Sequence, residues 1–136
     1  MEITRRTDYA IRILMELARS GGGPVSVRVL ATSQDVPYAF ARGIQRELAA
    51  AGLVESRRGA TGGAVLARSP EEITLLDVVH ATQTNSSCSV CTNDPTWCNR
   101  MGGCSVHQVW READEMMTGY LGTKSLAGLI GQERGR

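Results

Sequence analysis

Residues 26–52, SVRVLATSQDVPYAFARGIQRELAAAG, contain two short helical patterns separated by a tight polar turn. Ser26 can cap the first helix, which we expect over residues 27–34, because its hydroxyl can accept a hydrogen bond from a free backbone N–H group. Within this helix, Val29 and Leu30 are expected to face inward. Two short helices joined by such a turn are typical of a helix-turn-helix.

The second helix of this motif is predicted over residues 37–51. Pro37 suits its first turn because the proline ring fixes a helical backbone angle, and Gly52 suits its end. The apolar stripe of this helix, at steps of four residues, consists of Phe40, Ile44 and Leu48. Arg42 and Arg46 lie outside the stripe, as expected of a recognition helix that lies in the major groove of DNA.

A basic, glycine-rich loop follows the helix-turn-helix, and two short apolar runs flank it. The runs cover residues 53–56 and 64–67, and the loop RRGATGG covers residues 57–63. This pattern predicts a β-hairpin. Glycines allow a close approach of the backbone to DNA, and an arginine can contact phosphate or a narrow minor groove, so the hairpin is interpreted as a DNA-binding wing. A plain hairpin turn is the alternative interpretation.

Helices are also predicted on both sides of this module. One spans residues 7–19, with Thr7 as its N-cap, and another spans about residues 71–82. A long amphipathic helix follows over about residues 104–121. Its apolar residues, which step by three and four along one side, are Val106, Val109, Ala113, Met116 and Tyr120. In small DNA-binding proteins such a late helix often forms the dimer contact, although packing on its own domain is the alternative.

The expected fold class is therefore mainly α with a small β-wing, a winged helix-turn-helix with a long C-terminal dimerisation helix. We expect the DNA-binding domain over residues 1–82 and a cysteine-rich, cluster-binding loop over residues 83–104. The dimerisation helix and tail are expected over residues 105–136, with a short final helix at 125–130 and a loose end at 131–136. These parts are expected to form one compact domain overall.

The composition fits a small DNA-binding protein. With 136 residues and a hydrophobic fraction of 42%, the chain is long enough for one core. No apolar run reaches the length of a membrane span and the charged N-terminus does not resemble a signal peptide, so we expect a cytoplasmic protein without a membrane partner. Residues 1–68 carry ten Arg or Lys and six Asp or Glu, a net charge of +4, whereas residues 69–136 carry −3. A basic N-terminal half suits contact with phosphate, and no grouping of catalytic residues suggests an enzyme.

All the cysteines of the chain lie within residues 88–104, and a histidine follows them closely. These residues are Cys88, Cys91, Cys98, Cys104 and His107. Disulfides are rarely structural in the cytosol, whereas thiolates and imidazole are the ligands of iron–sulfur and zinc sites. Cys104 and His107 lie three residues apart at a helix start, so both can point toward the same metal. The stretch is therefore interpreted as a metal or cluster site.

Two ligand sets are compatible with this spacing: three cysteines with His107, or all four cysteines. The mixed set gives a pH-sensitive and more labile site, which suits a sensor. Structural zinc on the same ligands is one alternative, and a thiol–disulfide switch is another. A small iron–sulfur electron carrier is an alternative of a different class, which the helix-turn-helix argues against. We expect an iron–sulfur-dependent, DNA-binding transcription regulator that senses cluster status, iron, redox state or nitric oxide.

Together these motifs resemble the Rrf-type winged-helix transcription regulators over almost the whole chain. The matching segments are TDYAIR (7–12), AGLV (51–54), SRRG (56–59), GG (62–63), IT (73–74), DVV (77–79), CSVHQVWR (104–111) and TGYL (118–121). The resemblance implies a homodimer that binds a pseudo-palindromic operator in double-stranded DNA.

By matching position, the resemblance also assigns DNA-binding residues. On the recognition helix and the wing these are Ala39, Arg42, Gly43, Arg46 and Arg58. The expected set is completed by Arg28, Tyr38, Gly62 and Gly63. Members of the IscR type carry acidic and amide residues where this chain has Arg42 and Gly43, so their operator sequence does not carry over. An arginine at this place favours guanine.

The cysteine loop is similar to that of IscR-type members, which hold a 2Fe–2S cluster on three cysteines and one histidine. The ligands implied here are Cys91, Cys98, Cys104 and His107. The loop is one residue longer than in that type, and Cys88 is a spare thiol. Residues 7–9 are instead similar to the NsrR type, in which an aspartate of the partner subunit can ligate a 4Fe–4S cluster. Cys88 and Asp8 of the partner subunit are therefore alternative ligands, and a 2Fe–2S cluster is expected ahead of a 4Fe–4S cluster, with zinc as the alternative.

Overall fold

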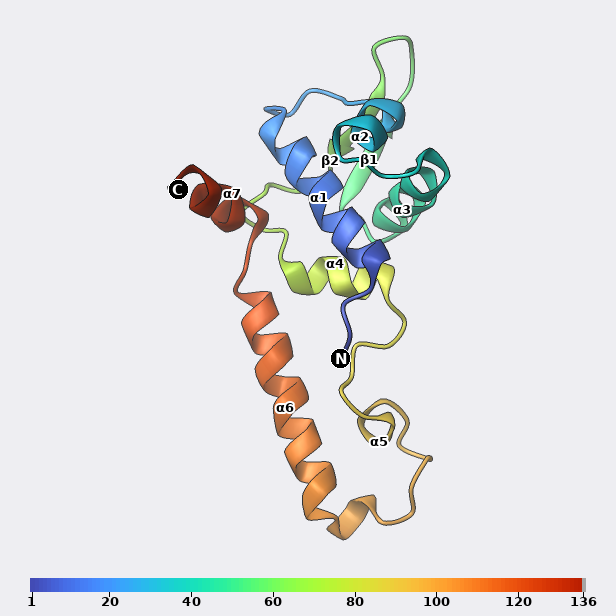
Figure 1. Cartoon of the computed structure of the whole chain (residues 1–136), viewed down its shortest axis with the longest axis vertical. Helices are drawn as coiled ribbons and strands as arrows, with labels where there is room; N and C mark the ends of the chain where they lie inside the picture. Colours follow the sequence, from blue (N-terminus) through green and yellow to red (C-terminus); the bar gives the residue numbers. More distant parts are fainter. Residues whose placement is uncertain (136) are drawn as a thin grey trace.

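A long helix, α6, extends away from a group of shorter elements in the computed structural model, which describes residues 1–135 (Figure 1). In chain order the elements are α1 (Arg5–Arg19), α2 (Val27–Ser33), α3 (Tyr38–Ala50), β1 (Val54–Arg57), β2 (Gly63–Leu66), α4 (Leu75–Thr82), α5 (Val90–Asn93), the 3-10 helix η1 (Met101–Gly103), α6 (Ser105–Gly122) and α7 (Leu126–Arg134). The mainly helical fold with one small β-hairpin is confirmed.

Helix α1 lies at the centre of the core and packs against α2, α3, α4, β2 and α7. Ala10 and Leu14 are fully buried on its inner face, as the helical period predicts. Its N-cap is Thr4, whose side chain accepts a hydrogen bond from the backbone N–H of Thr7. The predicted cap at Thr7 is therefore wrong, and its hydroxyl is buried in contacts with Thr82 instead.

The helix-turn-helix forms from α2 and α3 as predicted. Ser26 caps α2 by accepting a hydrogen bond from Val29 at 3.2 Å. The turn between the helices places Asp35 at a φ of 53°, a left-handed conformation that aspartate tolerates, and the Val36 N–H donates to the Ala31 carbonyl at 2.8 Å. Pro37 is the N-cap residue of α3 rather than its first helical residue.

Two predictions of burial in this motif are wrong. Val29 is 55% exposed, because a helix as short as α2 buries only its neighbours Leu30 and Ala31. Phe40 is 48% exposed, because it lies in the first turn of α3 at the edge of the core. Ile44, one step along the same stripe, is fully buried as predicted.

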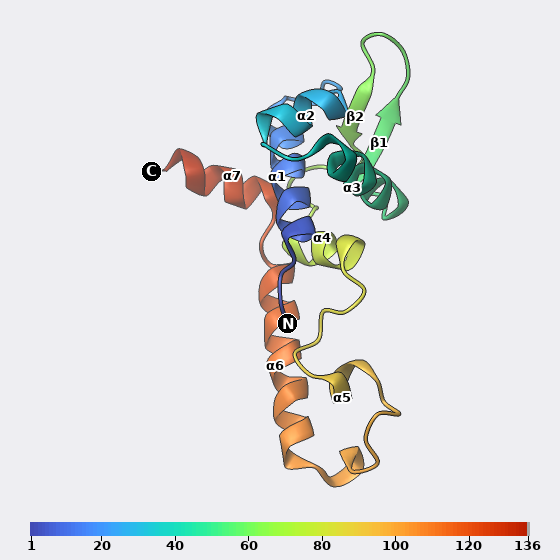
Figure 2. The same cartoon turned by 45° about the vertical axis from the view of Figure 1, so that its right-hand side comes forward.

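The predicted hairpin is confirmed, with β1 and β2 antiparallel from the pair Val54 and Leu66 to the pair Arg57 and Gly63. A single bridge between Val25 and Ala64 joins the hairpin to the chain just before α2. The loop of the hairpin projects from the end of the molecule opposite to α5 and the start of α6 (Figures 1 and 2).

Helix α4 begins at Leu75, later than residue 71, because Thr74 and Asp77 form a reciprocal capping box there. Residues 69–72 form a turn before it, in which the Glu72 N–H donates to the Ser69 carbonyl at 3.0 Å. The inner side of α4 is buried as predicted, with Val78 fully buried.

The C-terminal helices differ from the prediction at their ends. Helix α6 begins at Ser105 and has no buried residue, so its apolar stripe is open, with Met116 76% exposed. Helix α7 continues to Arg134, so the expected loose end from residue 131 is wrong for 131–134, and Arg136 lies outside the described residues. Among residues 1–135, none of the helices has the length and apolar content that crossing a membrane requires.

Candidate functional site

The expected DNA-binding residues come from α2, α3 and the hairpin loop. The exposed members of this set are Arg28, Tyr38, Ala39, Arg42, Arg46 and Arg58. Their elements lie together at one end of the molecule (Figures 1 and 2). Five exposed polar side chains and one small residue are therefore available to a nucleic acid at this end.

Tyr38 brings two arginines from different helices together. The Cζ atom of Arg28 in α2 lies 4.3 Å from the centre of the Tyr38 ring, and that of Arg42 in α3 lies 6.0 Å from it. A guanidinium over an aromatic face is attracted by the ring quadrupole. The exposed ring therefore gathers two positive charges at the start of α3.

Gly43 has a packing role that the sequence did not indicate. A Cβ atom at this residue would lie 2.7 Å from an Nη atom of Arg6, so the arginine of α1 occupies the space that glycine leaves on α3. The Nε of Arg6 also donates to both carboxylate oxygens of Glu47, one turn further along α3, at 2.9 Å each. The DNA contact of Gly43 stays a prediction, and the flexible end of Arg6 lies in the space that a side chain there would occupy.

Gly62 and Gly63 lie where the hairpin backbone passes close to other backbone segments. A Cβ atom on Gly62 would lie 2.2 Å from the Arg57 carbonyl oxygen. Gly63 has a φ of 152°, and a Cβ atom there would lie 2.4 Å from the Val25 carbonyl carbon. Both glycines are thus required by internal contacts, and their contacts with DNA stay predictions.

The cysteine loop brings Cys91 and His107 together across sixteen residues. The Nδ1 atom of His107 lies 3.3 Å from the Sγ of Cys91, which is 9% exposed. Cys104 is the N-cap of α6, and its Sγ accepts a hydrogen bond from the His107 backbone N–H at 3.5 Å. Three of the four expected ligands therefore lie around the first turn of α6.

Cys88 is held further along α6. Its backbone N–H donates to Asp114 Oδ1 at 2.7 Å, and its thiol donates to the Trp110 carbonyl at 3.4 Å. Partial desolvation and then the Asp114 carboxylate raise the pKa of the Cys88 thiol. Partial desolvation opposes ionisation of Asp114, but hydrogen bonds from Thr92 and Cys88 outweigh it, so the pKa of Asp114 is lowered. Cys88 is thus tied to α6 through its backbone N–H and its thiol.

The other candidate ligands, Cys98 and Asp8, do not lie beside Cys91 and His107. Cys98 is half-buried between α5 and η1, and Asp8 is exposed in the first turn of α1. Within residues 1–135, no three His, Cys, Asp or Glu side chains converge closely enough to hold a metal ion. The donor types nevertheless fit iron or zinc, because Cys91, Cys104 and His107 offer two sulfurs and one imidazole on one turn of helix and a short loop.

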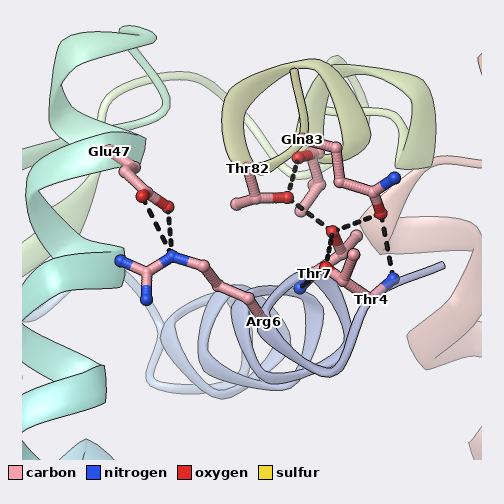
Figure 3. Close-up of polar contacts among 7 residues, drawn as sticks. Thr4, Arg6, Thr7, Glu47, Thr82 and Gln83 are labelled. Carbon is pink, nitrogen blue, oxygen red and sulfur yellow. Dashed lines mark hydrogen bonds and ion pairs between the residues drawn. The ribbon is translucent and has the colours of Figure 1, made fainter. Parts of the chain in front are cut away.

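Two groups of polar contacts at the start of α1 lie between the cysteine loop and α3, and no sequence pattern indicated them. Figure 3 shows Gln83, the first residue after α4, with its amide against Thr4 and Thr7 of the α1 start, and Arg6 on the other side against Glu47. Thr7 is fully buried. No period or motif links residues so far apart along the chain, so only the fold reveals these contacts.

Comparison with known proteins gives one consistent family. The profile of the Rrf2 family, described as an iron-dependent transcriptional regulator, matches residues 3–132. Protein rrf2 of Nitratidesulfovibrio vulgaris is 34% identical over 131 residues, which cover 96% of this chain and 87% of that protein. The regulator NsrR of Halalkalibacterium halodurans is 35% identical over 123 residues, which cover 89% of this chain and 82% of that protein.

Solved structures agree with these matches. CymR of B. subtilis, called the global cysteine regulator, has a TM-score of 0.80 and 25% identity, and the match covers 97% of this chain and 98% of that one. IscR of T. potens has a TM-score of 0.78 at 24% identity, with 98% of this chain and 88% of that one covered, and at this identity it supports the fold alone.

Proposed function

This chain belongs to the Rrf2 family of DNA-binding transcription regulators. From this membership we propose that an iron–sulfur cluster on its cysteine loop controls its affinity for an operator. Its relatives are transcription regulators rather than enzymes, as the sequence predicted. The observation that carries the proposal is the approach of His107 in α6 to Cys91 in α5 at 3.3 Å.

The ligands of the proposed 2Fe–2S cluster are Cys91, Cys98, Cys104 and His107. When bound, the cluster supplies a group that changes charge on oxidation and that is lost when iron is scarce. Cys88 and Asp8 of the partner subunit are the alternative ligands, which apply if the cluster is of the 4Fe–4S type. The protein itself orients His107, because Cys104 caps the helix that carries the imidazole.

Operator binding is assigned to the arginine-bearing end of the molecule. Arg42 and Arg46 of α3 enter the major groove, where arginine pairs best with guanine. Arg28 and Tyr38 support them from the start of the motif, and Arg58 contacts the backbone or minor groove from the wing.

The exposed apolar stripe of α6 supports a homodimer. Val106 and Val109 are 54% and 55% exposed, and Tyr120 is 60% exposed further along the helix. A continuous stripe of this kind is unfavourable in water, and a second copy of α6 covers it with a self-complementary surface. Two recognition helices then read the two halves of a pseudo-palindromic operator.

Anaerobic purification tests the cluster. We expect a coloured protein that contains iron and sulfide, and we expect His107→Ala to lose colour or change its spectrum. His80→Ala is the matched control, because His80 is exposed in the last turn of α4 and lies outside the cysteine loop. A colourless protein that contains stoichiometric zinc would contradict the cluster and indicate a structural zinc ion instead.

Operator binding tests the regulatory part. We expect loaded and cluster-free protein to differ in affinity for the same operator fragment by about tenfold, which corresponds to roughly 1.4 kcal/mol. Equal affinity of the two forms would exclude the sensory role even if the cluster is present.

A further inference from the structure

Gln83 joins the start of the cysteine loop to the start of α1. Its Oε1 accepts hydrogen bonds from the Thr4 backbone N–H at 3.1 Å and from the Thr7 hydroxyl at 2.6 Å (Figure 3). Its Nε2 donates to the Glu2 carbonyl at 3.0 Å. Gln83 directly follows α4 and opens residues 83–104, so any movement of the loop start acts on these bonds.

Thr7 fixes this junction inside the core. Its side chain is fully buried, and its hydroxyl lies 2.7 Å from the Thr82 hydroxyl. Because Thr7 donates its one proton to Gln83, Thr82 is the donor of this pair, and its single proton is shared between the Thr7 oxygen and the Val78 carbonyl. Because Thr7 is fully buried, the loss of its hydrogen-bond partners would leave a desolvated hydroxyl, which favours one geometry of this junction. The ends of α1 and α4 are therefore locked to each other.

Arg6, the neighbour of Thr7, reaches the recognition helix. Its Nε donates to both oxygens of Glu47 at 2.9 Å, and its guanidinium occupies the space above Gly43. The Arg6 Cζ also lies 5.9 Å from the centre of the Phe40 ring. Three contacts of one side chain thus follow one face of α3 over two turns.

We propose that the first turn of α1 couples the cysteine loop to the recognition helix, with Gln83 and Arg6 as its positioning residues. This inference rests on the proposed function for the signal, and on the structure alone for the coupling. Consecutive residues in one helical turn cannot move independently, so a displacement at Thr7 moves Arg6 with it. The cysteine loop and the wing lie at opposite ends of one chain, so the loop does not reach the wing of its own chain directly (Figures 1 and 2).

The Arg6–Glu47 pair is more exposed than the Thr7 hydroxyl that Gln83 contacts, so a change at Arg6 affects stability less than a change at the Thr7 junction. Arg6 and Glu47 have side chains that are 31% and 36% exposed, and a pair in such a position adds little to stability. A variant at Arg6 is therefore expected to fold normally and to lose only the placement of α3. The proposed role of the Arg6–Glu47 pair is therefore to position α3 rather than to stabilise the fold.

Hydrogen exchange of the cluster-free protein tests the coupling without any cofactor or DNA. We expect Gln83→Leu to speed amide exchange roughly fivefold in the first turn of α1 and also in α3 around residue 47, the loss expected for a hydrogen bond in this network. Gln132→Leu, at an exposed position of α7, is the control that should change neither region. Faster exchange confined to residues 2–7 and 82–85 would overturn the coupling.

Operator affinity tests Arg6 against its neighbour. Arg5→Leu and Arg6→Leu remove the same charge from the same turn, but Arg5 is exposed and has none of the α3 contacts described for Arg6. We expect the affinity ratio of loaded to cluster-free protein to fall toward one in Arg6→Leu and to persist in Arg5→Leu. If Arg6→Leu keeps the wild-type affinity ratio, the coupling is overturned. If the wild-type protein contains no iron, or has an affinity ratio of one, the proposed function is overturned instead. The hydrogen-exchange experiment then tests the coupling by itself.

Discussion

Gly63 is the position where the wing meets the chain before α2, and alanine there is expected to unfold this junction. The backbone of Gly63 has a φ of 152°, and an added Cβ would lie 2.4 Å, 2.5 Å and 2.7 Å from three backbone atoms of Val25 and Ser26. The backbone conformation costs a residue with a side chain about 1–3 kcal/mol. The contact adds roughly 1–3 kcal/mol, because backbone atoms cannot rotate away as a side chain can.

Two other glycines separate these terms. Gly59, at a φ of 110°, has nothing within 4 Å of an added Cβ. Gly59→Ala is therefore destabilised only by the unfavourable backbone conformation. Gly23 has nothing within 4 Å either and no positive φ, so Gly23→Ala should be neutral or slightly stabilising. Thermal unfolding of cluster-free protein should place Gly63→Ala roughly 8 °C below Gly59→Ala, which corresponds to about 2 kcal/mol of contact energy. Equal midpoints for Gly59→Ala and Gly63→Ala would refute the close approach of Val25 to the hairpin.

Three further outcomes follow from the site. Arg58→Ala should lower the slope of log affinity against log salt by about one, and an unchanged slope would remove the wing arginine from the DNA contacts. Tyr38→Leu should weaken operator binding roughly threefold, whereas Tyr38→Phe should not, because only the ring holds Arg28 and Arg42 together; equal affinities would show that the ring is not used. Met116→Asp should give a monomer in sedimentation, since Met116 is 76% exposed in the α6 stripe, and an unchanged mass would place the interface elsewhere.

Local patterns predicted the helix-turn-helix well, because its determinants are close together along the chain. Ser26 and Ile44 behave as the capping rule and the helical period require. The cap of α1 was misplaced for a different reason. Thr4 and Thr7 are both suitable caps, and the choice depends on Thr82, a partner that lies 75 residues away from Thr7. Contacts of this kind cannot be inferred from a single sequence.

The cysteine site shows the same limit. Cys104 and His107 share a helix start, so their proximity follows from spacing alone. The approach of Cys91 depends on α5, a short helix inside a stretch that has no apolar period. Cys98 lies beyond that helix, and its place as a fourth ligand stays a prediction. Spacing predicted the ligand types, which stay a prediction, whereas the geometry of the loop depends on its folding against α6.

The distance between the two sites restricts how a signal passes between them. Figures 1 and 2 show the wing at one end and the cysteine loop at the other, with α4 and α1 between them. A signal from the loop has two routes into the DNA-binding module: through α6, which packs on α4, or through Gln83, which bonds the start of α1. Both routes meet where α4 ends against α1, at the hydrogen bond between the Thr7 and Thr82 hydroxyls. Because α1 and α4 both pack on α3, a change at this junction can reach the recognition helix through either of them.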